Sequence, residues 1–327
     1  MDPSQPLAVC IDIGGTKAFI GIVDQSGSIL ARERYAPSLS MSPQELVQAL
    51  AERSRALAGR EQIAWERIAG VGYSTAGMMD VETGIIFASP NQGDWRNVPY
   101  KALLEKSFSL PVWIEMDANA AALGEAWLGA GAGARYFIHV IIGTGIGAGI
   151  LLGGEVMRGW RGTAGEFGHT IIDINGPLCN CGRNGCLESL ASGPAIALRA
   201  RAAVKTEPGS LLTSLAGENE ISTLIVFQAA RAGDKTALAV LDETIHFLAV
   251  GLSNLIHLLN PQVIALGGGV AIGGASLLVE PLREKTYALC GSWVDIQGTK
   301  ICIAQLGENA GILGAARLVW QKLSGIS

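Results

Sequence analysis

The sequence contains no run of lysines and arginines, although 24 of its 327 residues are basic. Acidic residues number 29, so the formal net charge is −5. Proteins that bind nucleic acid usually concentrate basic side chains in a patch or along one helix. We therefore expect no nucleic-acid partner.

The beginning of the chain lacks the basic segment and long apolar core of a secretory signal peptide. Two segments, 136–154 and 246–279, contain no Asp, Glu, Lys or Arg, and their length alone would permit a membrane span. Glycines interrupt both segments, and Asn260-Pro261 interrupts the second, whereas a spanning helix must be unbroken. We therefore expect a cytoplasmic protein with no membrane partner.

Charged residues make up only 16% of the chain and hydrophobic residues 49%, which suffices for a large core in one or two domains. Residues 9–24 and 139–155 share one pattern: an apolar strand, a Gly/Thr turn and a second apolar strand. A repeat of this kind suggests two related α/β lobes. We expect a smaller lobe of residues 1–116 plus 309–327 and a larger lobe of residues 117–308.

Hydrophobic periodicity predicts the remaining elements. We expect strands at 68–74, 84–88, 112–116, 262–266 and 300–304, and a loop at 89–99. We expect helices at 43–59, 117–129, 193–203, 222–231, 236–259, 274–288 and 309–323.

Cysteine is scarce, yet three of the six lie within eight residues. Cys179, Cys181 and Cys186 follow His169, and one imidazole with three thiolates makes a closed tetrahedral zinc set. Gly182 and Gly185 let the backbone turn tightly enough to direct several sulfurs to one point. The alternative is three small buried cysteines. Clustered cysteines in a cytosolic protein more often bind metal, so we favour a structural zinc site.

Two glutamates lie beside this cluster, and three further cysteines lie outside it. Glu166 and Glu188 flank the cluster, so the metal would hold two carboxylates in place. Cys10, Cys290 and Cys302 lie in apolar surroundings and are interpreted as core residues.

Two Gly/Thr turns are candidate phosphate sites. DIGGTK at 12–17 puts a carboxylate at a strand end before two glycines, a threonine and a lysine, and IGTGIG at 142–147 is the second turn. Glycines let backbone N–H groups approach phosphate oxygens. DIGGTK has neither the P-loop nor the GxGxxG spacing. Either turn alone could be purely structural, but the matched pair favours a nucleoside triphosphate held from both sides.

Two further positions remain ambiguous from the residues alone. IALGGGVA at 264–271 could lie against an adenosine, but a tight strand-to-helix connection explains it better when taken alone. Asp117 ends a strand and starts a helix, a common place for a catalytic group at the carboxyl edge of a sheet. Aspartate is also a favoured N-cap residue, and we expect Asp117 at the N-cap position.

The chain resembles the ROK family of sugar kinases and sugar-responsive repressors, within the actin-like ATPase superfamily. The resemblance covers nearly the whole length and rests on DIGGTK, DANAAALGE, IGTGIGAGI, GTAGEFGH, CNCGRNGCLE and ALGGG, in the family's order. It implies an α/β, two-lobed actin-like ATPase (ribonuclease H-like) fold with an interlobe cleft. It also implies ATP, Mg²⁺ and structural Zn²⁺ as cofactors, a small-molecule sugar as substrate, and a homodimer or homotetramer.

The resemblance also implies roles for individual residues. Asp117 would take the proton from the sugar hydroxyl. The sugar's other hydroxyls would be bound by Asn91, Glu166, His169 and Glu188, with His169 also a zinc ligand through its second nitrogen beside Cys179, Cys181 and Cys186. Asp12 would help to place Mg²⁺. The nucleotide would be bound by Gly14, Gly15, Thr16, Lys17, Gly143, Thr144 and Gly145 around its phosphates, and by Gly267, Gly268 and Gly269 along the adenosine.

The sequence departs from the family pattern at two places. The family usually has Asn-Asp where this chain has Met116-Asp117, and methionine accepts only weak hydrogen bonds and donates none. We therefore expect one sugar position to be read differently, or its hydroxyl to be solvated. Trp160-Arg161 stands where small residues are common. Trp160 would stack on a sugar face or pack against the protein, and we favour packing.

The leading interpretation is an ATP-dependent hexose kinase that acts at the 6-hydroxyl of glucose. Kinases for N-acetylmannosamine, N-acetylglucosamine, fructose, an amino sugar or a polyol are the alternatives within this class. A sugar-sensing repressor would need a helix-turn-helix, and only about eight residues precede the first strand, too few for that motif. A non-catalytic sugar-binding regulator is less favoured, because Asp117 and both phosphate turns are retained.

Overall fold

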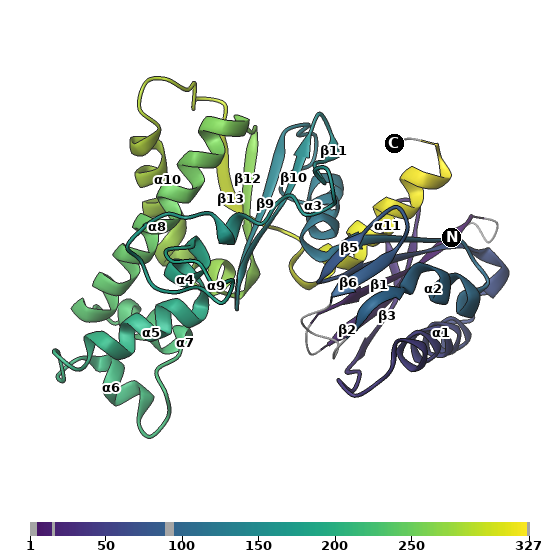
Figure 1. Ribbon diagram of the computed structural model, residues 1–327, viewed down its shortest axis with the longest axis horizontal. Coiled ribbons are helices and arrows are strands. Elements are labelled where there is room, and N and C mark those ends of the chain that lie inside the picture. Colours follow the sequence, from purple (N-terminus) through teal and green to yellow (C-terminus); the bar gives the residue numbers. More distant parts are fainter. Residues whose placement is uncertain (1–4, 15–16, 89–94, 326–327) are drawn as a thin grey trace. The chain divides into compact units, whose positions relative to one another are not determined.

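The computed structural model describes residues 5–14, 17–88 and 95–325. Within them the chain forms two five-stranded sheets and one three-stranded sheet, accompanied by helices (Figure 1). The α/β class expected from the sequence is confirmed.

The first sheet and the small sheet comprise β1 (Leu7–Ile13), β2 (Ala18–Asp24), β3 (Ile29–Tyr35), β4 (Ile68–Thr75), β5 (Met78–Asp80), β6 (Ile85–Ala88), β7 (Arg96–Pro99) and β8 (Val112–Met116). The second sheet comprises β9 (Phe137–Ile142), β10 (Ile146–Leu152), β11 (Glu155–Val156), β12 (Val263–Gly267) and β13 (Lys300–Ile303). The α-helices are α1 (Pro43–Arg60), α2 (Tyr100–Phe108), α3 (Asp117–Leu128), α4 (Leu187–Ala191), α5 (Gly193–Ala203), α6 (Leu211–Ala216), α7 (Thr223–Arg231), α8 (Lys235–Leu259), α9 (Gly268–Gly273), α10 (Ala275–Cys290) and α11 (Ala310–Leu323). Three short 3₁₀ helices are η1 (Trp65–Arg67), η2 (Phe167–His169) and η3 (Gly307–Asn309).

The chain divides into two compact units. Unit 1 comprises Met1–Gly133, Gly149–Ala164 and Leu306–Ser327, and unit 2 comprises Ala134–Ala148 and Gly165–Gln305. The division expected from the sequence began the second lobe at residue 117, whereas in the structure α3 belongs to unit 1. The reason is packing, because α3 lies along α11.

The order of the first sheet is β3-β2-β1-β4-β8. β1 is antiparallel to β2 and parallel to β4, and β8 is parallel to β4. The register pairs Asp12 with Ser74 and Thr75 with Met116. The carboxyl ends of three neighbouring strands therefore meet at one edge of the sheet, the position at which open α/β sheets bind ligands.

The second sheet repeats this arrangement with the order β11-β10-β9-β12-β13. β12 is parallel to both β9 and β13, as β4 is parallel to β1 and β8. The matching orders agree with the repeat between residues 9–24 and 139–155.

Both faces of the first sheet are buried, because successive residues of a strand point to opposite sides. Val9 and Ile11 of β1 belong to a core cluster with residues of α1 and α2. Ala8 and Cys10, which alternate with them, belong to a second cluster with residues of α11. The sheet of unit 1 is thus the middle of three layers, and the expected core position of Cys10 is confirmed.

Helices α3 and α11 approach each other closely through glycine. A Cβ atom at Gly124 would lie 2.4 Å from the carbonyl oxygen of Ala310. A Cβ atom at Gly314 would lie 1.6 Å from the carbonyl oxygen of Ala120. Both contacts are with backbone, which cannot move aside as a flexible side chain can, so only glycine fits at these two positions.

Several strands and helices of the structure were not expected from the sequence. Strands β3, β5 and β7 and helices α2, α4 and α6 were not predicted, and β7 lies within the expected loop. The expectation that Asp117 caps α3 was wrong: Met116 is the N-cap, and Asp117 is the first helical residue.

Among the described residues, α8 is long and apolar enough to cross a membrane by length and composition, and 56% of its most apolar window is buried inside the fold. Buried core helices meet the same criteria.

We expect Gly314→Ala to destabilise the fold by at least about 2 kcal/mol, because the added methyl group overlaps backbone of α3. Gly59→Ala in α1 is the matched control, since a Cβ there has no neighbour within 4 Å. Removing the flexibility of glycine within a helix should stabilise that variant by about 0.5–1 kcal/mol. Urea unfolding of both variants measures the difference, and equal midpoints would contradict the close packing.

Candidate functional site

Asp12 is a half-buried carboxylate at the carboxyl end of β1. Ser74, its parallel neighbour on β4, donates a hydrogen bond of 2.7 Å from Oγ to Oδ1 of Asp12. Burial raises the pKa of Asp12 to about 6, with the hydrogen bond from Ser74 opposing the rise and the nearby Asp117 adding to it. A Cβ atom at Gly311, in the first turn of α11, would lie 2.3 Å from the carboxyl carbon of Asp12. This carboxylate therefore needs a glycine beside it.

Asp117 begins α3, directly after the neighbouring strand β8. Its Oδ1 accepts a hydrogen bond of 2.8 Å from the backbone N–H of Ala118. Burial raises the pKa of Asp117, and backbone hydrogen bonds oppose the rise. Asp12 and Asp117 thus lie close enough at one edge of the sheet for the charge of Asp117 to raise the pKa of Asp12.

Glu115, two residues before Asp117, is buried, with 0% of its surface exposed. In contrast to Asp12 and Asp117 it has several donors. Its Oε1 accepts from Asn119 Nδ2 and from the backbone N–H of Met116, both at 3.0 Å. Its Oε2 accepts from Nε of Arg158 at 2.8 Å and forms an ion pair with Nη2 at 2.7 Å. This network holds the end of β8 in place.

The first Gly/Thr turn is described only in part. The backbone N–H of Gly14 donates to the carbonyl oxygen of Lys17 at 2.9 Å, which closes the turn between β1 and β2. Nζ of Lys17 forms an ion pair of 2.5 Å with Glu308 of η3. Gly15 and Thr16 lie outside the described residues.

The four predicted metal ligands of unit 2 come together. The ligand atoms of His169, Cys179, Cys181 and Cys186 all lie within 4.8 Å of one another. Sγ of Cys181 is 3.5 Å from Sγ of Cys186, and Sγ of Cys179 is 3.7 Å from Nδ1 of His169. Bonds of about 2.0–2.3 Å to a shared tetrahedral zinc place ligand atoms at such separations. The donor set and its geometry fit structural zinc.

The backbone of this loop explains the glycines between the cysteines. Gly182 and Gly185 have φ values of 86° and 71°, in the left-handed region that favours glycine. A Cβ atom at Gly185 would lie 1.5 Å from the carbonyl oxygen of Asp173. The expected tight turning is confirmed.

The two ring nitrogens of His169 face different partners. Nδ1 lies on the sulfur side, and Nε2 is 4.0 Å from Oε2 of Glu166. A metal on Nδ1 would therefore leave Nε2 beside the Glu166 carboxylate. Glu188 also faces a functional segment, because its Oε2 accepts a hydrogen bond of 2.9 Å from the backbone N–H of Ile146, directly after the second Gly/Thr turn.

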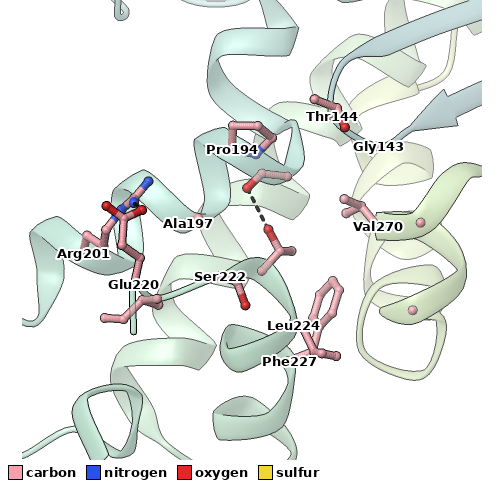
Figure 2. Close-up of a pocket in the computed structure, with 15 residues that line it drawn as sticks. Gly143, Thr144, Pro194, Ala197, Arg201, Glu220, Ser222, Leu224, Phe227 and Val270 are labelled. Carbon is pink, nitrogen blue, oxygen red and sulfur yellow. Dashed lines mark hydrogen bonds and ion pairs between the residues drawn. The ribbon is translucent and has the colours of Figure 1, made fainter. Parts of the chain in front are cut away.

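A cavity of about 670 Å³ opens beside this second turn (Figure 2). Its lining comes from the turn, from α5, from α7 with the residues before it, and from α9: Gly143, Thr144, Gly193, Pro194, Ala197, Arg201, Glu220, Ile221, Ser222, Thr223, Leu224, Phe227, Gly269, Val270 and Gly273. Gly143 and Thr144 stand at one end, and the ion pair of Arg201 with Glu220 stands at the other. Apolar walls with a few polar groups are typical of small-molecule sites.

The three consecutive glycines after β12 occupy different environments. Gly269 lines the cavity. Gly268 has a φ of +83°, and a Cβ there would lie 2.4 Å from the carbonyl oxygen of Ile142. A Cβ at Gly267 would lie 2.4 Å from Nε2 of His139. Gly267 and Gly268 thus permit close packing on β9.

The other predicted positions give mixed outcomes. Asn91 lies outside the described residues. The side chain of Met116 packs against the apolar core of unit 1. The expectation that Trp160 packs against the protein was wrong, because 93% of its surface is exposed. Cys290 is buried as expected, and Cys302 is half-buried.

Sequence reasoning missed the polar end of the cavity and the Glu115 network. Arg201 and Glu220 lie on separate elements, so no local pattern connects them. Ser222 did carry a signal, since a serine before an apolar helical run is a typical N-cap, and its side chain accepts from the N–H of Ile225. The DANAAALGE motif begins at Asp117, so it gave no indication of a role for Glu115, two residues before it.

The model for the ROK family matches residues 8–322. A curated glucokinase from Thermotoga maritima is 37% identical over 96% of this chain and 98% of its own length. The crystal structure of a ROK family glucokinase from Streptomyces griseus, in complex with glucose and AMPPNP, is 34% identical over 95% of this chain and 98% of that chain, with a TM-score of 0.77. A ROK family transcriptional regulator, a homologue of the E. coli MLC protein, is 25% identical and covers 100% of this chain and 81% of that chain, with a TM-score of 0.87.

We expect Asp12→Asn to raise the free energy of unfolding by up to about 3 kcal/mol at pH 7.5 without Mg²⁺ or nucleotide. The folded-state pKa of Asp12, about 6, exceeds the ordinary value of 3.8, so ionisation at neutral pH opposes folding. The gain should shrink as the pH falls through 6 and disappear below the ordinary value, where both forms are neutral. Urea unfolding at several pH values measures it. Ser74→Ala should lower the free energy of unfolding at pH 7.5, because it removes a hydrogen-bond donor from ionised Asp12. A gain in Asp12→Asn that does not change with pH would contradict the interpretation.

Proposed function

Because this chain belongs to the ROK family, we propose that it is an ATP-dependent sugar kinase that phosphorylates glucose at its 6-hydroxyl. The observation that carries the proposal is the pair of half-buried carboxylates, Asp12 and Asp117, at the carboxyl edge of the parallel strands β1, β4 and β8. The glucokinases among its relatives supply the choice of glucose.

Asp117 is the general base of this proposal. A sugar hydroxyl is a poor nucleophile, and a carboxylate within hydrogen-bond reach assists it by accepting its proton during attack. A general base works best when its pKa lies near the pH of the reaction, and the raised pKa of Asp117 moves in that direction. Phosphoryl transfer otherwise needs positioning and charge neutralisation rather than covalent chemistry.

Asp12 fits a Mg²⁺ ligand, because hard cations prefer oxygen ligands and its half-buried carboxylate has, among the described residues, a single side-chain hydrogen-bond donor, Ser74. Bound Mg²⁺ would neutralise charge on the transferred phosphoryl group. The backbone of Gly14, Gly143 and Gly145 would hold the phosphates. The cavity beside Thr144 would take the adenosine, with Gly269 and Val270 on one wall.

For the sugar, we assign hydroxyl contacts to Glu166, His169 and Glu188, and retain Asn91 as a further contact. Structural zinc would hold His169 through Nδ1, with Cys179, Cys181 and Cys186 completing the set. That leaves Nε2 of His169 to face the sugar. We also infer a cytoplasmic location, where reduced thiols persist.

Two alternatives follow from specific observations. Met116 packs into the core where the family usually has a sugar-contacting asparagine, so another hexose, an N-acetyl sugar or a polyol is the second candidate within the class. The similarity to a transcriptional regulator favours a sugar-sensing role as the second class. Turnover distinguishes kinase from sensor.

The test is ADP release with Mg-ATP across hexoses, N-acetyl sugars and polyols. We expect the strongest turnover with glucose. Asp117→Ala should lower kcat by about 10²–10⁴-fold, the usual contribution of a general base, with a sugar Kd changed less than about threefold. Asp295→Ala, at an exposed loop position, is the matched control and should retain turnover. Unchanged kcat in Asp117→Ala would overturn the base assignment, and silence with every sugar would overturn the kinase.

We expect zinc removal to lower stability and sugar affinity together. Cys181→Ser should lower the melting temperature by several degrees and raise the sugar Kd, because the cluster orients His169. Cys302→Ser, outside the cluster, should keep its zinc, measured by elemental analysis. Full sugar affinity in demonstrably zinc-free protein would contradict the link.

A further inference from the structure

Glu188 is one of the sugar contacts assigned above, and it also contacts the second Gly/Thr turn. It occupies the first turn of the short helix α4, two residues after the zinc ligand Cys186. Its Oε2 accepts the backbone N–H of Ile146 at 2.9 Å. A Cβ atom at Gly145 would lie 2.5 Å from the same oxygen. The carboxylate therefore packs directly on the backbone of the second Gly/Thr turn.

The turn is positioned from two consecutive helices. Its own backbone is closed by a hydrogen bond of 2.9 Å from the N–H of Gly143 to the carbonyl oxygen of Gly145. The N–H of Gly193, at the start of α5, donates to the carbonyl oxygen of Gly143 at 2.8 Å. Glu188 on α4 supplies the other attachment. Both bonds join the turn to one continuous stretch of chain, so movement of α4 is transmitted to the turn.

The same helix is attached to the segment that carries Glu166 and His169. The backbone N–H of Leu187 donates to the carbonyl oxygen of Thr170 at 2.9 Å, next to His169. Helix α4 also packs against η2. Among the described residues, no hydrogen bond reaches Oε1 of Glu188. One carboxylate oxygen is thus engaged by the turn, and the other is available to a ligand.

We propose that Glu188 couples the two substrates by bridging them: Oε2 stays on the backbone of the nucleotide turn while Oε1 accepts a sugar hydroxyl. The inference rests on the proposed function and adds a positioning role to it. A sugar hydroxyl on Oε1 fixes the carboxylate, and the fixed carboxylate holds the turn in the conformation that receives the phosphates. Nucleotide binding orders the same turn, so each ligand strengthens binding of the other by the same factor.

The first measurement is the coupling factor itself. Isothermal titration gives the Kd of Mg-AMPPNP with and without saturating glucose, or the sugar that gives turnover, and the reciprocal pair of Kd values for the sugar. We expect each ligand to tighten the other about tenfold, within the usual range of coupling between sites. A factor of one in the wild-type protein would overturn the proposal.

Two glycine substitutions, one in the turn and one outside the site, then separate loss of the bridge from a general effect of the added methyl group. Gly145→Ala displaces the Glu188 carboxylate with a methyl group, so the sugar Kd measured without nucleotide should rise at least about fivefold and the coupling should disappear. Gly298→Ala, at an exposed position outside the assigned site, is the control, because a Cβ there meets nothing within 4 Å, and its sugar Kd without nucleotide should stay unchanged. Equal sugar affinity in the two variants would contradict the bridge.

Glu188→Gln provides a test that does not depend on steric displacement. In the amide, one terminal oxygen is replaced by an NH₂ group, which donates only, so a side chain whose oxygen stays on the N–H of Ile146 cannot accept a sugar hydroxyl at the position of Oε1. We expect a raised KM for ATP at saturating sugar in addition to a raised sugar KM. A rise confined to the sugar KM would show a simple sugar ligand and overturn the coupling. These outcomes differ from failure of the kinase proposal, in which the wild-type protein would release no ADP with any sugar.

Discussion

The close contact of α3 with α11 determines where both candidate catalytic carboxylates lie. Gly124 and Gly314 remove the side chains that would otherwise separate the two helices from each other's backbone. Asp117 is the first residue of α3, so whatever fixes that helix fixes the carboxylate. Asp12 lies against Gly311 in the first turn of α11. One packing interaction within unit 1 therefore positions two groups that are 105 residues apart in sequence.

Features whose chemistry is concentrated in a short stretch were predictable from sequence. The four predicted metal ligands fall between 169 and 186, and few other chemistries require three thiols and an imidazole so close together. The strand–turn–strand repeat was visible because strands buried on both faces, such as β1 and β2, give apolar runs. Family resemblance then supplied roles that residue types alone left open, above all for Asp117.

Features assembled by tertiary packing were not predictable. The cavity draws its polar end from Arg201 in α5 and Glu220 before α7, and nothing in either segment indicates the other. The start of α3 was misjudged by one residue because aspartate suits both the N-cap and the first turn of a helix. Trp160 was expected to pack because large aromatic residues usually do, yet its surroundings leave it exposed.

The three carboxylates at the end of the first sheet differ in burial and in their hydrogen-bond donors: Glu115 is fully buried, whereas Asp12 and Asp117 are half-buried. Glu115 receives donors from Met116, Asn119 and Arg158, so its charge is compensated within the protein. Among the described residues, Asp12 accepts from the side chain of Ser74 and Asp117 from the backbone N–H of Ala118, and burial raises the pKa of both. A charge buried without sufficient partners costs stability and persists where a ligand is to supply the missing partner. This contrast favours Asp12 and Asp117 over Glu115 as the candidate functional carboxylates.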